Sequence, residues 1–260
     1  MATILSIGKL DPRGFAGITR DVITATEHGV DTRSVATYCV SPEDGAFHPF
    51  AVSLVQAQLS HLLTPDVSCL KIGALVTAEM MDLIGDFIEQ QVLPRHITII
   101  LEPVMTSARG KKMVMEPEAM RAYERRLFHR AHLLCPNISE AQRLTGLEIR
   151  DLESMRHAAD MLMTLGNSAV LLTGGSLIGD VVFDIFASEN GVLTYSSPRY
   201  GDRSPEGTGD ALTAAIAANI ALGLSLDEAV RQGREYTRKG IHDYATACLD
   251  SSPDSLQRGA

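Results

Sequence analysis

Short apolar runs that alternate with longer segments of helical period are the feature that most constrains the fold of this 260-residue chain. Each run is almost continuously apolar or β-branched, which is typical of strands buried on both faces of a parallel sheet. The runs predict strands at residues 2–8, 33–40, 68–72, 97–102, 132–136 and 168–173. The remaining segments predict helices at about 16–29, 49–63, 77–92, 116–130, 139–146, 151–166, 209–223 and 225–246. This order predicts an α/β protein with a central, mainly parallel sheet between two helical layers.

The last two predicted strands differ from the others. Residues 181–187 and 192–197 flank the turn Glu189-Asn190-Gly191, which predicts an antiparallel hairpin at the edge of the sheet. No internal repeat, low-complexity tract or charge block divides the sequence. We therefore expect a single domain over residues 1–260, built as a three-layer α/β/α sandwich.

Composition excludes several classes of function. With 23 Lys+Arg against 32 Asp+Glu and a net charge of −9, the chain is not expected to bind nucleic acid or an anionic membrane surface. No apolar run is long enough to span a bilayer, and the amino-terminal segment lacks the pattern of a signal peptide. The four cysteines lie far apart, as reduced thiols do in cytoplasmic proteins, so we expect a cytoplasmic location.

The predicted helix at 209–223 is preceded by a Gly-Thr-Gly turn. Gly207, Thr208 and Gly209 would present backbone N–H groups at the positive end of the helix dipole, which suits a phosphate or a transferring phosphoryl group. Asp210 follows in the first helical turn, where a carboxylate could accept a proton from an attacking hydroxyl. The alternative is that the glycines only permit close packing and that Asp210 caps the helix. The helix itself, ALTAAIAANIAL, is apolar all round, which favours a buried position for this turn.

Polar or small residues also follow the predicted strands. Because the carboxyl ends of parallel strands meet at one edge of a sheet, we expect these residues to line one crevice. The segments are DPRGFAG at 11–17, KIG at 71–73, EPVM at 102–105, CPNISE at 135–140 and TGG at 173–175. Asn137 and Glu140 carry oxygen atoms that could hold a hydrated Mg²⁺ ion. Plain turns, and a helix-start carboxylate at Glu140, are the alternatives.

In sequence order, these five segments and GTGD resemble the motifs of hydroxymethylpyrimidine kinases and pyridoxal kinases, a branch of the ribokinase superfamily. The resemblance extends from Ser6 to about Ile241 and is most specific over residues 207–230. It implies a ribokinase-like fold with the three layers described above. It also implies a homodimeric enzyme that uses ATP and Mg²⁺ to phosphorylate the hydroxymethyl group of a small heteroaromatic alcohol.

The resemblance further implies roles for individual residues. The anion hole for the transferring phosphoryl group would be formed by Gly207, Thr208 and Gly209, and Asp210 would be the catalytic base. The nucleotide and its metal would be bound by Asn137, Glu140, Thr173, Gly174 and Gly175, with Mg²⁺ held by Glu140, Asn137 and Glu102. The pocket for the ring would be lined by Lys9, Asp11, Gly73, Ala74 and Val104.

The chain departs from the family pattern around the ring pocket. Lys9 and Phe15 stand where glycine is expected, which adds bulk beside the ring. Residues 41–49, where relatives keep a polar ring-binding residue, form a shorter segment here. Asp210 stands where pyrimidine kinases usually have cysteine, and it matches the form found in pyridoxal kinases and ribokinases. These changes leave the identity of the ring open.

Other departures concern the phosphates. Ala108 and Thr173 stand where the family has lysines, and Glu102 stands for the usual aspartate. The phosphates would then be met by nearby cations, namely Arg109, Lys111 or Lys112.

The leading hypothesis is therefore a kinase that phosphorylates hydroxymethylpyrimidine, and its monophosphate, in thiamine biosynthesis. One alternative is a pyridoxine or pyridoxal kinase in vitamin B6 salvage. Another is a ligand-binding relative with weak catalysis, which the missing lysines at 108 and 173 motivate. A sugar kinase is a further alternative, because GTGD is shared across the superfamily.

Overall fold

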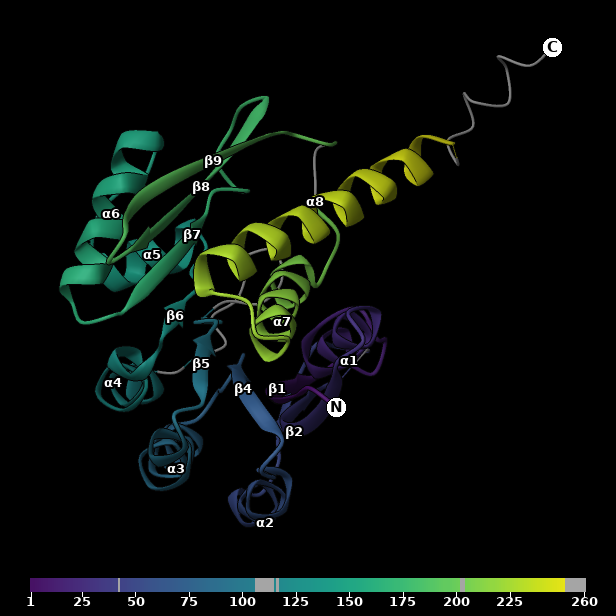
Figure 1. Cartoon of the computed structure of the whole chain (residues 1–260), viewed down its shortest axis with the longest axis vertical. Coiled ribbons are helices and arrows are strands. Elements are labelled where there is room, and N and C mark those ends of the chain that lie inside the picture. The colour runs from purple at the N-terminus through teal and green to yellow at the C-terminus, as the bar shows by residue number, and fades with distance from the viewer. Residues whose placement is uncertain (42, 106–114, 116, 202–203, 251–260) are drawn as a thin grey trace.

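A single nine-stranded sheet runs through the computed structural model, which describes residues 1–41, 43–105, 115, 117–201 and 204–250 (Figure 1). The strand order is β3-β2-β1-β4-β5-β6-β7-β8-β9. The strands are β1 (Thr3–Leu10), β2 (Asp31–Val40), β3 (Phe47–Pro49), β4 (Val67–Ile72), β5 (Thr98–Leu101), β6 (Leu133–Leu134), β7 (Ala169–Thr173), β8 (Val181–Ser188) and β9 (Gly191–Pro198).

Six neighbouring strands in the middle of the sheet are parallel, namely β2, β1, β4, β5, β6 and β7. The strands at both edges of the sheet pair in antiparallel fashion. The hairpin β8–β9 forms one edge and turns at Gly191, as the sequence predicts. The other edge is β3, which no sequence pattern predicts. Three residues that end in a proline are too short to show a strand period, so β3 depends on its pairing with the end of β2.

Helices cover both faces of the sheet, so the three-layer architecture is confirmed. The helices are α1 (Gly17–Glu27), α2 (Val52–Leu62), α3 (Ala78–Phe87), α4 (Pro117–Arg126), α5 (Ile138–Thr145), α6 (Leu152–Thr164), α7 (Thr208–Ala221) and α8 (Leu226–Asp250). The first and the last two of these, α1, α7 and α8, lie together on one face, and the others lie on the opposite face (Figure 1). No helix within the described ranges is long and apolar enough to cross a membrane.

Three predicted boundaries are wrong. The helix expected over 77–92 ends at Phe87, and the chain continues as a π turn, Ile88–Val92, and a 3₁₀ turn, Leu93–Arg95. The helix expected over 116–130 ends at Arg126. The strand expected over 132–136 contains only Leu133–Leu134, although the N–H groups of His132 and Cys135 also donate to carbonyls of β5, those of Ile99 and Leu101.

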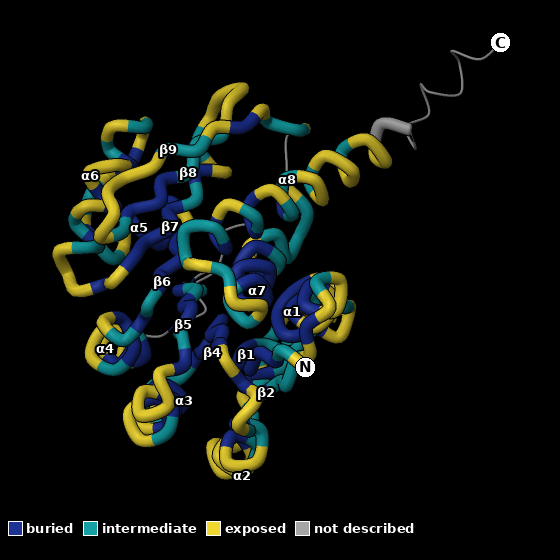
Figure 2. Tube along the Cα trace, in the orientation of Figure 1, coloured by how far each residue is buried: buried dark blue, intermediate teal, exposed yellow. Residues whose placement is uncertain are grey.

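The core lies on both sides of the sheet. Ile4 belongs to the cluster that packs against α7 and α8, while its neighbour Leu5 belongs to the cluster on the other face. This alternation explains why the strands read as continuous apolar runs. The helix α7 is buried along most of its length, and its small residues permit close packing (Figure 2). The turn before α7 is thereby held against a rigid centre.

Candidate active site

The GTGD turn enters α7 under a strict steric constraint. Gly207 has φ +79°, and a Cβ atom there would lie 1.9 Å from the carbonyl oxygen of Phe15. Only glycine fits such a position. The first N–H that bonds within this helix is that of Ala211, to the carbonyl of Gly207 at 2.9 Å. The preceding N–H groups, of Thr208, Gly209 and Asp210, have no acceptor in the helix and suit an anion.

Asp210 is held by two donors from other parts of the chain. Its Oδ1 accepts from Lys71 Nζ at 3.0 Å, and its Oδ2 accepts from the backbone N–H of Gly17 at 2.9 Å. Burial disfavours the charged form of Asp210, but the charges of Lys71 and Lys9 outweigh burial and hold its pKa below the ordinary value. Asp210 is therefore an oriented carboxylate, free of its proton at neutral pH.

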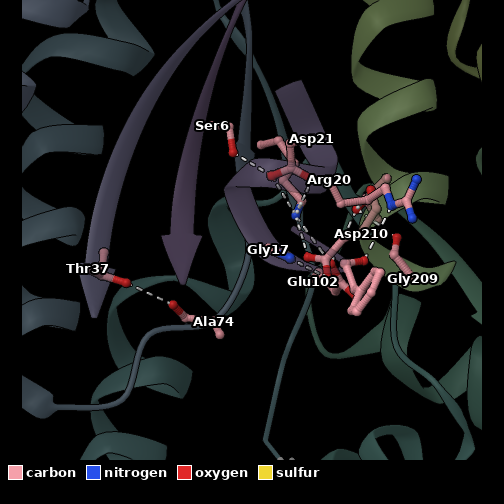
Figure 3. Close-up of polar contacts among 12 residues, drawn as sticks. Ser6, Gly17, Arg20, Asp21, Thr37, Ala74, Glu102, Gly209 and Asp210 are labelled. Carbon is pink, nitrogen blue, oxygen red and sulfur yellow. Dashed lines mark hydrogen bonds and ion pairs between the residues drawn. The ribbon is translucent and has the colours of Figure 1, made fainter. Parts of the chain in front are cut away.

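Lys71 is the centre of a buried ionic cluster. Its Nζ lies 3.0 Å from both carboxylate oxygens of Asp21 and 3.5 Å from Glu102 Oε2. Asp21 also accepts from Ser6 Oγ at 2.5 Å. Figure 3 shows Asp21, Glu102 and Asp210 converging on this point from α1, the end of β5 and α7.

One ammonium in this cluster faces three carboxylates. Burial, together with the charge of Asp210, raises the pKa of Asp21 to about 6 and that of Glu102 to about 7. The predicted ring residue Gly73 makes room for the cluster, because a Cβ atom there would lie 3.2 Å from Lys71 Nζ.

A cavity of about 670 Å³ opens beside this cluster, at the carboxyl ends of the parallel strands. It brings together most of the residues that the sequence predicts for the site. Those that line it are Lys9, Asp11, Glu102, Val104, Asn137, Glu140, Thr173, Gly175, Gly207, Thr208, Gly209 and Asp210. Three predicted residues, Gly73, Ala74 and Gly174, line neither this cavity nor the smaller one beside it. A Cβ atom on Gly174 would lie 2.1 Å from the carbonyl oxygen of Phe183, so this glycine permits close packing.

One wall of the cavity is apolar. Tyr38, Val40, Phe47 and Val104 pack together there, and the rings of Tyr38 and Phe47 meet edge to face with centroids 5.5 Å apart. Such a wall suits the flat face of an aromatic ring.

Two ion pairs join the loops that line one side of the cavity. Arg13 forms ion pairs with Asp11 at 3.1 Å and with Glu206 at 2.6 Å. These contacts tie the loop before α1 to the loop before α7 and hold the Asp11 carboxylate in a fixed direction.

The residues proposed for Mg²⁺ lie on the same cavity. Asn137 caps α5, where its Oδ1 accepts from the Glu140 N–H at 3.0 Å, and Glu140 Oε2 accepts from the Asn137 N–H at 2.9 Å. Burial raises the pKa of Glu140 to about 8, and the nearby Glu102 carboxylate adds to this shift. Among the described residues, Glu140 has no cationic partner.

These residues offer Mg²⁺ two carboxylates but not a complete set of protein ligands. No group of three or more potential metal ligands occurs in the described part of the chain. Mg²⁺, however, commonly takes only one or two carboxylates and completes its shell with phosphate and water. Glu102 and Glu140 supply two such carboxylates, while the side-chain oxygen of Asn137 is engaged in the helix cap.

A second cavity, of about 160 Å³, lies between the β8–β9 hairpin and α8, next to the GTGD turn. It shares Thr173, Gly175, Thr208 and Gly209 with the first cavity, so the two are adjacent. Its wall carries arginines that sequence patterns did not single out, namely Arg199, Arg234 and Arg238.

Two of these arginines are structural. Arg234 pairs with Asp184 at 2.7 Å and lies over the ring of Tyr195 at 4.2 Å from its centroid. Arg199 donates to backbone carbonyls in the loop that follows Thr173, including that of Gly175 at 2.9 Å. They fix the walls of this second cavity.

No sequence motif predicts a role for Lys71 or Asp21. The signal was present, because a lysine within the apolar run SCLKI must find a partner if the run is a buried strand. Asp21 is one such partner, 50 residues away in the sequence. The cations expected to meet the phosphates, Arg109, Lys111 and Lys112, lie outside the described residues, as does Ala108.

Comparisons with known proteins agree with this geometry. The sequence profile of the phosphomethylpyrimidine kinase family matches residues 11–251. The hydroxymethylpyrimidine/phosphomethylpyrimidine kinase of Haemophilus influenzae is 30% identical over 246 residues, which cover 92% of this chain and 90% of that protein. The thiamine biosynthesis bifunctional protein ThiED of Geobacter sulfurreducens is 33% identical over 243 residues, 92% of this chain, and the chain spans only 49% of that protein.

A solved structure is also similar. The ADP complex of Bacillus subtilis pyridoxal kinase superposes with a TM-score of 0.82 and 26% identity, covering 90% of each chain. The ribokinase-like fold expected from the motifs is thus confirmed. With the profile match spanning nearly the whole sequence, the chain belongs to the phosphomethylpyrimidine kinase family.

Proposed function

We propose that this protein uses ATP and Mg²⁺ to phosphorylate the hydroxymethyl group of a small heteroaromatic ring, hydroxymethylpyrimidine before pyridoxine-type pyridines. The observation that carries the proposal is the placement of Asp210, an ionised carboxylate at the start of α7, beside unbonded backbone N–H groups and an apolar wall. Base, anion hole and ring pocket are the three parts that transfer of a phosphoryl group to an alcohol requires.

The chain's own residues divide the work. The ring lies against Tyr38, Phe47 and Val104, which directs its hydroxymethyl group toward Asp210. Asp210 accepts the hydroxyl proton as the oxygen attacks the γ-phosphorus of ATP, and the bond from that phosphorus to the β–γ bridging oxygen breaks, so that ADP leaves. The N–H groups at the start of α7 bind the transferring phosphoryl group without reorganising, because α7 is packed in the core.

Mg²⁺ would be held by Glu102 and Glu140, and when bound it would neutralise charge on the phosphates of ATP. The adjacent smaller cavity, with Arg234 and Arg199 in its walls, would receive the rest of the nucleotide. This arrangement also explains how an acidic chain would bind a triphosphate.

The site also bears on two alternative functions. A pyridoxal kinase activity is supported by the similarity to the Bacillus subtilis enzyme and by Asp210, which matches the pyridoxal kinase form of the motif. A catalytically weak relative is disfavoured by the intact base and anion hole. The homodimeric state and the cytoplasmic location expected from the sequence stay predictions.

The test is the substitution Asp210→Asn, which keeps the shape of the side chain and removes the base. We expect kcat to fall by about 10²- to 10⁴-fold on hydroxymethylpyrimidine, with ATP affinity nearly unchanged in calorimetry. The amide places a donor against Lys71 or the Gly17 N–H, so a loss of about 1–3 kcal/mol in unfolding free energy accompanies it.

The matched control is Asp160→Asn, since Asp160 is exposed on α6, away from the cavity. A panel of hydroxymethylpyrimidine, its phosphate, pyridoxine, pyridoxal and ribose, with ATP consumption as readout, identifies the ring. Full activity in Asp210→Asn would overturn the role of this residue, and no turnover on any acceptor would overturn the kinase assignment.

A further inference from the structure

Lys9 presents a positive charge that no group of the described chain neutralises by contact. It lies near the end of β1, is only partly exposed, and lines the larger cavity. Within the part of the chain that the structure describes, no carboxylate lies within ion-pair distance of its Nζ. A partly buried ammonium without a partner is uncommon, because leaving water costs free energy that an opposite charge normally offsets.

The carboxylates around Lys9 are already engaged by other donors. Asp11 and Glu206 pair with Arg13. Asp210 and Glu102 pair with Lys71, and they also accept from the Gly17 N–H and the Thr213 hydroxyl, respectively. Glu140 accepts from the Asn137 N–H. The field of Lys9 reaches several of them and lowers the pKa values of Asp11 and Asp210. Lys9 therefore lies near the base yet keeps its own hydrogen-bonding capacity for something that enters the cavity.

The position of Lys9 points to the acceptor rather than the nucleotide. Lys9 shares its cavity with Tyr38, Phe47 and Val104, the apolar wall that suits the ring. It does not line the smaller cavity, whose walls are formed by the β8–β9 hairpin and α8.

We propose that Lys9 is a specificity-determining residue that binds an anionic group carried by the acceptor, either a phosphate monoester or a carboxylate on the ring. The inference rests on the proposed function, since it takes the larger cavity as the acceptor site. The apolar wall holds the ring, Asp210 faces the reacting oxygen, and Lys9 supplies a charge-assisted hydrogen bond to the anion. A neutral alcohol leaves this ammonium unpaired and binds more weakly.

The test compares Lys9→Met, which keeps the length of the side chain without its charge, with Lys9→Arg and with Lys239→Met. Lys239 is exposed on α8 and lies outside this cavity, so its variant controls for the loss of one positive charge. Three acceptors are used: hydroxymethylpyrimidine, its monophosphate, and a hydroxymethylpyridine with a ring carboxylate. For each, kcat/KM is measured with ATP, and the dissociation constant is measured without ATP by calorimetry.

In Lys9→Met we expect kcat/KM and affinity for an anionic acceptor to fall by about 10- to 100-fold, the range of hydrogen bonds to charged groups. The loss for the neutral alcohol is smaller, because only the effect of the Lys9 charge on Asp210 is removed there, Lys9→Arg retains part of the preference, and Lys239→Met resembles wild type. Whether the monophosphate or the carboxylate loses more identifies the anion. An equal loss on neutral and anionic acceptors, or no loss on either anion, would overturn the proposal.

Failure of the kinase assignment is distinguishable from failure of this inference. If no acceptor is phosphorylated but an anionic ring compound binds in a Lys9-dependent manner, the role of Lys9 stands and the activity does not. If turnover proceeds and every acceptor is insensitive to Lys9→Met, the activity stands and the role of Lys9 does not. If no acceptor binds or reacts, both are overturned.

Discussion

Replacement of Lys71 by methionine tests the central claim that one buried cation balances the charges of the site. Lys71 is 1% exposed, and carboxylate oxygens of Asp21 and Asp210 lie 3.0 Å from its Nζ. Glu102 follows at 3.5 Å. Methionine has a similar length and no charge, so the substitution removes the ammonium without opening a large cavity.

The expected loss of unfolding free energy follows from the carboxylates that stay buried without Lys71. Removing one partner of a buried ion pair typically costs about 3–5 kcal/mol, because the other charge stays buried without compensation. Native stabilities are about 5–15 kcal/mol, so the variant is expected to fold but to melt about 6–20 °C lower for a chain of this size.

The loss also has a predicted pH dependence. In the folded chain burial raises the pKa of Asp21 to about 6 and that of Glu102 to about 7, above their values in the unfolded chain. A carboxyl with a raised folded pKa contributes stability below its unfolded pKa and loses it as pH rises through the folded pKa. Without Lys71 these shifts grow. The cost of Lys71→Met is therefore larger at pH 8 than at pH 5, where the carboxyls are protonated.

The assay is urea-induced unfolding of wild type, Lys71→Met and the control Lys239→Met at pH 5 and pH 8. Lys239 is an exposed lysine on α8, so its removal should change stability by less than about 0.5 kcal/mol. A loss below about 1 kcal/mol in Lys71→Met at pH 8, or the same loss at both pH values, would show that the ammonium does not balance this cluster.

Two further substitutions test single features of the site. Gly207→Ala forces a side chain onto the carbonyl oxygen of Phe15 and should lose about 1–3 kcal/mol of stability together with most turnover. The matched control is Gly29→Ala, whose positive φ of 71° is similar but whose Cβ would meet nothing within 4 Å, so an equal loss in both would contradict a steric cause. Glu140→Gln removes a carboxyl whose pKa burial raises to about 8. With EDTA present, the unfolding free energy of wild type should therefore fall as pH rises toward 8. In the variant this fall should be smaller by up to about 1.4 kcal/mol per pH unit. Equal pH dependence of the two proteins in urea titrations would refute this explanation.

The parts of the fold that the sequence predicts correctly are those with a local cause. Continuous apolar runs locate the parallel strands because both faces of these strands are buried, and Gly191 marks the hairpin because the turn needs a positive φ. The strand β3 has no such local cause, since its three residues are extended by pairing with β2. The π turn after Phe87 is equally invisible, because its residues have an ordinary helical pattern.

The same division applies to the candidate site. Residues that directly follow a strand, such as Asp11, Glu102 and Asn137, could be predicted because the carboxyl ends of parallel strands meet at one edge. The pairing of Lys71 with Asp210 could not, because the two lie 139 residues apart and are joined only by the packing of α7 against the sheet. A sequence shows which residues carry charge, whereas the fold decides which charges neutralise each other.

The same distinction explains how an acidic chain would accommodate an anionic ligand. The net charge is −9, and five carboxylates line the larger cavity, a count that by itself would repel a phosphate. Each of these carboxyl groups, however, already accepts a hydrogen bond or an ion pair from the chain. Burial also raises the pKa values of Glu102 and Glu140, which reduces the negative charge that these two groups present near neutral pH. In the part of the chain that the structure describes, the first N–H groups of α7 have no acceptor within the helix and the Lys9 ammonium has no ion-pair partner, and both attract anions. The potential that an anionic ligand would meet at contact is therefore set by the groups without partners rather than by the number of carboxylates.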